Sequence, residues 1–267
     1  KYDNKNISNY VTDSYGGTLG FSYPIDETKS LSAGLNLDRT AIKAGRYLAV
    51  SNYDYLVENG SVDTSKDNQG IPSFESEGFN TYGLNLGWNM NTLNRGRFPT
   101  KGMSHNVNLN LAFGDVTYQK MVYQGNYYHP FYKNTVLRGY TKLGYGNDLP
   151  FWENFFAGGY GSVRGYENST LGPTSNRYYT SYINNGVDPY PEEIGGNALA
   201  QVGTELILPM PFKGDWAEQI RPVLFVEGAQ VFDTTNKYDK TIAVDGKQVP
   251  LLNEKDNNMR FSAGAGF

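Results

Sequence analysis

One segment near the middle of the chain alternates between apolar and polar residues without a break. Its apolar positions are Val107, Leu109, Leu111 and Phe113, and three asparagines, Asn106, Asn108 and Asn110, stand between them. A period of two predicts a strand whose two faces meet different surroundings. A face of three asparagines is a poor protein core but suits a water-filled lumen, and the apolar face suits lipid. The segment therefore predicts a strand of a membrane β-barrel.

The same alternation recurs along most of the chain. It is found at Thr18–Tyr23, Leu31–Asp38, Tyr82–Asn89, Asn106–Phe113, Gln119–Tyr127, Thr135–Tyr145, Asn197–Leu208, Pro222–Asp233 and Met259–Phe267. These segments predict about nine antiparallel strands, several of them near the ~9–11 residues that a tilted strand needs to cross a bilayer. The aromatic fraction of 15% and the 31 glycines agree with half-buried strands and many turns. No stretch approaches ~18 uninterrupted apolar residues, which excludes a transmembrane helix.

The connections between these segments differ in length from one end of the strands to the other. Compact turns are predicted at one end, near Pro24–Asp26, Arg95–Gly102, His129–Pro130 and Pro209–Pro211. Most of the connections at the other end are long, namely Arg39–Gly78, Asn147–Gly196 and Thr234–Asn258. Gly114–Thr117 is the one short connection among them. Outer-membrane barrels have short turns on one side and long loops outside. A soluble sandwich or jelly roll gives no reason for this pattern. We therefore expect an all-β, antiparallel transmembrane barrel of the outer membrane.

Nothing in residues 1–267 indicates a second domain, and the polar stretch Ser61–Gln69 reads as an insertion in a loop. Nine strands is an odd number, and the last alternating segment stops at Phe267. An open sheet would leave two edges of unpaired backbone groups in hydrocarbon, which is prohibitively costly. We therefore expect the chain to be part of a larger barrel, or to pair its edges with another chain.

Few residues of the chain could take part in catalysis or bind a metal ion. There are no cysteines, which excludes disulfides and thiolate metal sites, and the net charge of −4 with no basic patch argues against a nucleic-acid partner. The two histidines, His105 and His129, have neither ligand nor triad spacing and read as ordinary interfacial or turn residues. We therefore expect no catalytic, metal or cofactor site.

Two carboxylates stand out by their position in the alternation. In Asn197–Leu208 the parity places Glu205 on the lumen face, and in the next strand Glu227 is a lone acid among apolar residues. Antiparallel neighbours could bring the two side chains close together in the barrel wall. Two nearby carboxylates repel, and raise each other's pKa, unless a cation lies between them. The alternative is that lumen water solvates both acids.

The long connection Asn147–Gly196 contains an unusual run of aromatic residues and glycines around one cation. It reads from Phe151 to Pro173 and includes Val163-Arg164-Gly165-Tyr166. This run closely resembles the signature loop of the BamA family of outer-membrane assembly barrels. Three further segments agree in order with that family: Leu93–Gly102, Ile194–Ala198 and Leu208–Phe212. The wider superfamily also contains two-partner secretion transporters and organellar import barrels.

The resemblance implies a sixteen-stranded barrel whose sixth extracellular loop enters the lumen. There the arginine of the Val-Arg-Gly-Tyr motif meets acids on the wall, and by position these residues are Arg164, Glu205 and Glu227. The family pattern has aspartate at the position of Glu227, so this chain departs from it by one methylene. A guanidinium is also the partner that two inward carboxylates require. Val163, Arg164, Gly165, Tyr166, Glu205 and Glu227 thus form the expected loop-to-wall contact.

The resemblance further implies a central barrel component of the machinery that folds and inserts β-barrel proteins into the outer membrane. The implied partners are nascent outer-membrane barrel proteins, accessory lipoproteins and outer-membrane lipid. The chain would cover roughly strands six to fourteen, without the POTRA repeats or the first and last strands. The alternative is a polypeptide-secreting transporter of the two-partner type. A third possibility, an outer-membrane hydrolase, would need a Ser–His constellation that His105 and His129 do not supply.

Overall fold

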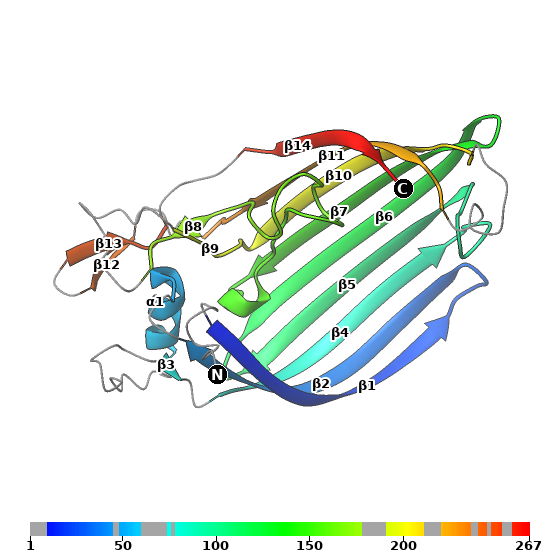
Figure 1. Ribbon diagram of the computed structural model, residues 1–267. Coiled ribbons are helices and arrows are strands. Elements are labelled where there is room, and N and C mark those ends of the chain that lie inside the picture. Colours follow the sequence, from blue (N-terminus) through cyan, green and yellow to red (C-terminus); the bar gives the residue numbers. More distant parts are fainter. Residues whose placement is uncertain are drawn as a thin grey trace, which may run out of the picture.

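The computed structural model describes residues 10–44, 48–59, 74–75, 78–177, 191–210, 220–235, 240–244, 247–252 and 258–267. Within these residues, one antiparallel sheet dominates the structure (Figure 1). Its strands, in spatial order, are β1 (Tyr10–Pro24), β2 (Lys29–Ala44), β4 (Phe79–Asn91), β5 (Gly102–Gly114), β6 (Tyr118–Tyr132), β7 (Thr135–Asn147), β10 (Ala198–Ile207), β11 (Val223–Phe232) and β14 (Arg260–Gly266). The two-residue strand β3 (Phe74–Glu75) adds to β2.

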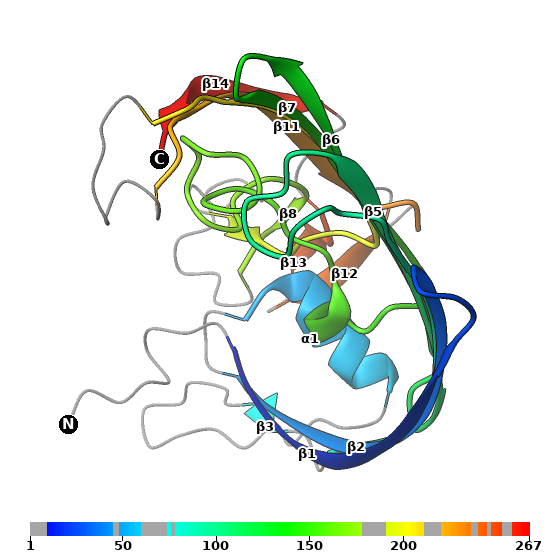
Figure 2. The ribbon, with the colours of Figure 1, turned by 90° about the vertical axis from the view of Figure 1, so that its right-hand side faces the viewer.

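Each of the nine predicted alternating segments corresponds to one of these nine strands, so the all-β antiparallel prediction is confirmed. Six strands extend beyond the predicted bounds, most clearly β1, which begins at Tyr10 and not at Thr18, whereas β10, β11 and β14 are one residue shorter than predicted at each end. Polar residues and glycines at strand ends hide the alternation there. Viewed along the sheet, the described strands form a wide arc with β1 and β14 at its two ends, and the arc does not close (Figure 2).

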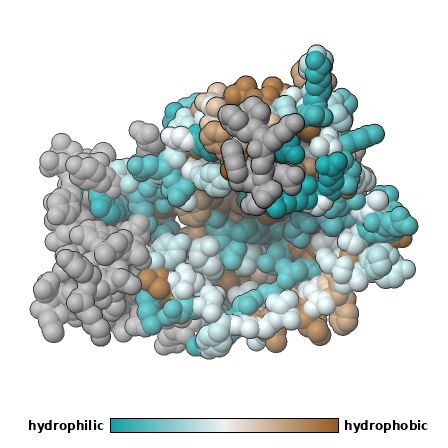
Figure 3. Space-filling view, turned by 45° about the vertical axis from the view of Figure 1, so that its right-hand side comes forward, coloured by the Kyte–Doolittle hydropathy of each residue, from teal (hydrophilic) through white to brown (hydrophobic). Residues whose placement is uncertain are grey.

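The two faces of the sheet have opposite character. Large apolar side chains on the convex face are exposed, with Phe21 at 74% and Leu35 at 60%. The concave face carries asparagines, glutamines and charged residues, and its hollow is lined mostly by hydrophilic residues (Figure 3). A sheet that exposes its apolar face and shelters its polar face suits lipid outside and water inside. The lumen face predicted from the three asparagines of β5 is therefore on the concave side.

The turn between β6 and β7 corrects one sequence expectation. His129 and Pro130 lie inside β6, and the chain reverses at Lys133 and Asn134, which both have positive φ, 34° and 38°. Two such residues make the tight two-residue turn that matches the twist of a hairpin. Pro130 is tolerated in the strand because the register shifts between Pro130 and Tyr132, and such an irregularity accommodates the missing N–H.

Two of the other connections at this end are compact, as predicted. Residues 25–28 form a short turn as expected. The connection 92–101 is compact because the Asn94 side chain closes it, donating to Thr100 Oγ1 at 2.8 Å and accepting from the N–H groups of Thr100 (3.1 Å) and Lys101 (3.2 Å). The turn predicted at Pro209–Pro211 is described as far as Met210.

The long connections contain elements that the alternation did not reveal. They are α1 (Val50–Glu58), the 3-10 helix η2 (Phe151–Glu153), and the small pairs β8 (Thr174–Ser175) with β9 (Glu192–Glu193) and β12 (Thr241–Val244) with β13 (Lys247–Pro250). The insertion predicted at Ser61–Gln69 lies outside the described residues. In the described part of the chain, no helix has the length and apolar character that crossing a membrane requires.

Helix α1 and η2 lie within the arc near the loop end of the strands (Figure 2). They share an apolar core with the concave face, in which Ile42, Leu56, Phe79, Phe151 and Phe155 are all buried. Several aromatic rings in this core contact one another, and the Trp152 ring stacks on Phe79 with 5.2 Å between centroids. This core fills one end of the lumen and holds the start of the long loop that follows β7.

Candidate functional site: a loop docked on the inner wall

The loop between β7 and β10 folds back along the concave face. Its two ends pair with each other, because the N–H of Phe155 donates to the carbonyl of Gly196 at 2.8 Å and the reverse bond is 3.0 Å. The ring of Phe155 lies directly over Gly144 of β7, where a Cβ atom would come within 2.6 Å of it. A glycine in the strand thus gives the loop room to approach the wall.

The tip of the loop turns sharply because it is rich in glycine. Gly158, Gly159, Gly161 and Gly165 all have positive φ, between 81° and 109°, a region that glycine enters without steric cost. Within this tip Val163 is completely buried. Tyr166 is partly exposed, and its hydroxyl lies 3.4 Å from the carbonyl of Phe261 on β14. The tip is therefore folded against the wall on both sides of Arg164.

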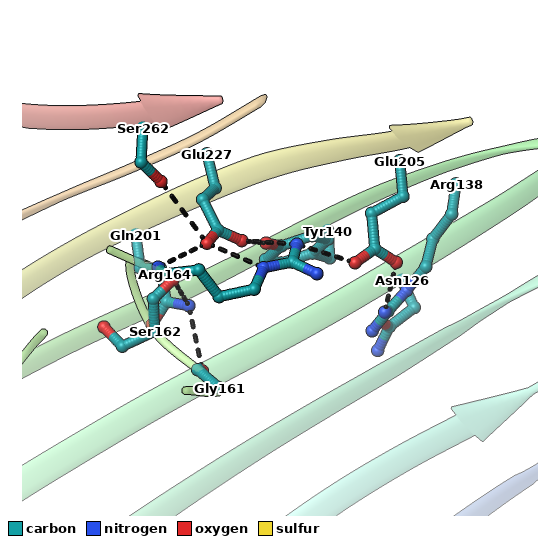
Figure 4. Close-up of polar contacts among 10 residues, drawn as sticks. All are labelled: Asn126, Arg138, Tyr140, Gly161, Ser162, Arg164, Gln201, Glu205, Glu227 and Ser262. Carbon is teal, nitrogen blue, oxygen red and sulfur yellow. Dashed lines mark hydrogen bonds and ion pairs between the residues drawn. The ribbon is translucent and has the colours of Figure 1, made fainter. Parts of the chain in front are cut away.

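Arg164 contacts both of the acids that the sequence analysis singled out, Glu205 and Glu227 (Figure 4). Its Nε donates to Glu227 Oε1 at 2.9 Å, and its Nη2 donates to Glu227 Oε2 at 2.7 Å and to Glu205 Oε1 at 2.8 Å. Its backbone N–H also donates to Glu227 Oε1 at 2.6 Å. Glu227 thus holds Arg164 by three bonds and Glu205 by one. These hydrogen bonds, those to Glu227 first, raise the pKa of Arg164 above its ordinary value.

The register of β10 and β11 explains how two acids on different strands reach one guanidinium. Glu227 pairs with Gly203 and Glu205 pairs with Phe225, so the acids are diagonal neighbours on one face. The Phe225 ring lies beside both, and the guanidinium carbon of Arg164 stands 3.5 Å above the ring centroid. Glu205 and Glu227 are buried, at 8% and 3% exposure. Two buried carboxylates require cations nearby, and stacking on Phe225 orients the one from the loop.

A second cation completes the network, and the sequence analysis did not single it out. Arg138 of β7 donates through Nη1 to Glu205 Oε2 at 2.8 Å and through Nη2 to Asn126 Oδ1 at 2.7 Å. The cluster therefore holds two arginines and two glutamates, and their formal charges cancel. The alternation within Thr135–Tyr145 puts Arg138 on the lumen face, so its orientation could have been predicted from the sequence. The alternation does not give the strand register, and it is the register that places Arg138 opposite Glu205.

Neighbouring residues hold the carboxylates and the loop in place. Tyr140 donates its hydroxyl hydrogen to Glu227, and it can reach because the residue between them is Gly203, where a Cβ would lie 2.2 Å from the tyrosine ring. Gln201 donates from Nε2 to the loop carbonyls of Gly161 (3.3 Å) and Ser162 (3.2 Å). The wall therefore binds the backbone of the loop as well as its arginine.

A polar cavity of about 340 Å³ lies beside this network, with Lys142, Gln124 and Tyr160 among its lining residues. In the described residues, no group of three or more histidine, cysteine or acidic side chains could hold a metal ion. The two histidines are separate from this site. His105 bonds Tyr123 at 2.8 Å, and His129 stacks on Tyr127. An arrangement of compensated charges of this kind can hold a loop against the wall.

Comparisons with known proteins give one consistent result. A family model described as the Omp85 superfamily domain matches residues 1–267. The outer membrane protein assembly factor BamA of Neisseria meningitidis serogroup B is 29% identical over 97% of this chain and 32% of its own length. The protein of the same name from Nitratidesulfovibrio vulgaris is 24% identical over 75% of this chain and 23% of its own length. The chain thus spans a third or less of these curated relatives.

Among solved structures, the crystal structure of BamA from Haemophilus ducreyi lacking POTRA domains 1-3 matches with a TM-score of 0.77 at 27% identity. The match covers 96% of this chain and 48% of that one. The arc of strands therefore has the fold of part of that barrel.

Proposed function

The chain belongs to the Omp85 superfamily, and on that premise we propose that it supplies part of the wall and the docked loop of a factor that folds and inserts other β-barrel proteins. The superfamily is one of outer-membrane barrels, and the apolar convex face of the sheet belongs in that membrane. Both curated relatives are named as assembly factors. The proposal needs no catalytic group, cofactor or nucleotide.

The observation that carries the proposal is the contact of Arg164 with Glu205 and Glu227. It holds the loop against the concave face, inside the space that an open conduit would use. This favours a barrel that works through its wall over one that works through its pore. We assign Val163, Arg164, Gly165, Tyr166, Glu205 and Glu227 a bracing role, in which the loop keeps this side of the wall rigid.

The partners in this proposal are nascent outer-membrane barrel proteins and accessory lipoproteins. A client strand would be bound at a strand edge by β-augmentation, in which backbone hydrogen bonds provide the affinity. The Arg164 contact would not touch the client. It would resist deformation of the wall while an edge of the barrel opens elsewhere.

The test uses the full-length protein in cells depleted of the native copy, with assembly of client barrels as the readout. Arg164→Ala should lower client assembly strongly and make the loop sensitive to protease, because it leaves Glu227 without its cation. Arg164→Lys should restore assembly only in part, since a lysine cannot make the paired bonds of a guanidinium. Tyr160→Ala is the matched control, because Tyr160 lies in the same loop and is 91% exposed.

Pore conductance separates the proposal from the alternative of a polypeptide-secreting transporter. If Arg164→Ala left client assembly intact but raised conductance and deregulated export of one partner protein, the transporter would be the better explanation. If Arg164→Ala changed neither protease resistance nor assembly, the bracing role would be wrong.

A further inference from the structure

The convex face carries an apolar groove that the lumen site does not explain. It spans β1, β2, β4 and β5, has a volume of about 670 Å³, and is lined chiefly by Phe21, Tyr23, Leu31, Ala33, Leu86, Trp88, Val107 and Leu109. Strand register puts these residues in two adjacent rows, one from Tyr23 to Val107 and one from Phe21 to Leu109. The groove is therefore a feature of the folded sheet and not of one side chain.

Ala33 accounts for the hollow. In its row it stands between Phe21 and Leu86, and along β2 its neighbours on the same face are Leu31 and Leu35. All four of these side chains are large, and each is at least 40% exposed. A single methyl group among four longer side chains leaves an apolar hollow, which an acyl chain can occupy.

Opposite charges lie next to the groove, beyond Leu31. Asp26 of the turn after β1 and Lys29, the first residue of β2, have charged atoms 3.3 Å apart, and Lys29 lies two residues from the lining residue Leu31 on the same face. Hydrogen bonds from Thr28 lower the pKa of Asp26 to about 2, so its carboxylate is ionised at neutral pH. Glu27 adds a further acid to the turn. A bound headgroup would therefore meet both signs of charge, with an excess of negative charge.

We propose that this groove binds one glycerophospholipid with a zwitterionic headgroup of the phosphoethanolamine type. One acyl chain lies over Ala33 between Phe21 and Leu86. The phosphate faces Lys29, and the ammonium group faces Asp26. Short turns of outer-membrane barrels lie on the periplasmic side, so the lipid comes from the inner leaflet. The site rests on the membrane fold and is independent of the assembly function proposed above.

The experiment measures lipid retained by the full-length protein, using native mass spectrometry from micelles that contain phosphatidylethanolamine or phosphatidylglycerol with identical chains. The unaltered protein should retain phosphatidylethanolamine preferentially. Ala33→Leu should lower this retention about tenfold, because the added methylenes occupy the space of the chain. Ala200→Leu is the matched control, since Ala200 belongs to the outward face of β10, outside the groove. Heat-modifiable migration reports whether each variant is folded.

A second pair of measurements tests the headgroup and the position. Lys29→Gln combined with Asp26→Asn should remove the preference between the two lipids while some chain binding persists. Brominated acyl chains should quench the fluorescence of Trp88 in the unaltered protein, and this quenched component should be absent from the Trp88→Phe variant. Equal retention by Ala33→Leu and Ala200→Leu, equal retention of the two lipids by the unaltered protein, or no quenching at Trp88 would each overturn the proposal. Protection of Trp88 by a protein partner would overturn it too.

Discussion

The loop between β7 and β10 contacts the barrel wall at two places whose chemistry differs. Near its start, Phe151, Trp152 and Phe155 pack against α1 and the concave face. Further along, Arg164 binds two acids on the inner wall, Glu205 of β10 and Glu227 of β11. The first contact is made of apolar area and tolerates changes of shape. The second depends on direction, because each carboxylate oxygen has a specific donor.

This difference predicts two kinds of response to mutation. The stability of an apolar contact scales with the area buried, at roughly 25 cal/mol per Å², so smaller side chains should weaken it by degrees. A buried ion pair behaves otherwise, because removal of one partner leaves the other charge without compensation. The apolar contact should therefore give graded losses, and the ionic contact should give abrupt ones.

The largest effect is expected for Glu227→Ala. It removes three bonds to Arg164 and the partner of the Tyr140 hydroxyl. We expect a loss of about 3–5 kcal/mol in the free energy of unfolding, measured by urea titration in lipid bilayers, together with protease cleavage of the loop.

The double variant Arg164→Met with Glu227→Leu sharpens this test, because it removes both charges and leaves Glu205 paired with Arg138. It should be more stable than the sum of the two single changes indicates. Simple additivity would show that the ionic contact is not a coupled unit.

A smaller loss is expected for Phe155→Ala in the apolar contact. Phe155 is 6% exposed, and its removal should cost about 3 kcal/mol in the same titration. Phe155→Leu keeps part of the volume and should lose clearly less. Equal losses for the two variants would contradict a contact whose strength follows buried area.

Gly203→Ala tests the ionic contact without changing any charge. The new Cβ would lie 2.2 Å from the Tyr140 ring, so the tyrosine must move away from Glu227. Overpacking of this kind should cost about 1–3 kcal/mol and should increase cleavage of the loop near Arg164. Gly139→Ala is the matched control on the adjacent strand, because a Cβ there meets no atom within 4 Å. An equally large loss in the control would point to backbone effects.

The smallest effect is expected for a partly exposed ion pair beside the apolar contact. Lys120 bonds the Glu153 carboxylate at 2.8 Å and also faces the Phe155 ring, and the Lys120 and Glu153 side chains are 21% and 33% exposed. Lys120→Met should lower stability by about 0.5–1 kcal/mol. The difference from the unaltered protein should shrink at high salt, which screens partly exposed pairs. A loss that does not depend on salt would assign Lys120 to the apolar contact.

The parts of the fold with a local signal could be predicted. Period-two alternation located the nine long strands of the main sheet and put Glu205 on the lumen face, because the side a residue faces follows from its position in the strand. Glu227 stood out as a lone acid among apolar residues of the next strand. The helix α1 was missed, since its sequence, Val50 to Glu58, gives little helical signal and the burial of residues such as Leu56 stabilises it in context. His129 and Pro130 looked like a turn because proline is rare within strands.

Alternation in the amino-acid sequence predicts the nine long strands and the face on which their side chains lie. Which of these side chains meet depends on the folded sheet, because register is set by hydrogen bonds between strands that are distant in the chain. Arg138 and Glu205 lie opposite each other only through the pairing of β7 with β10. Arg164 reaches Glu227, 63 positions away, only because the loop returns into the arc. A local period of two carries no information about either event.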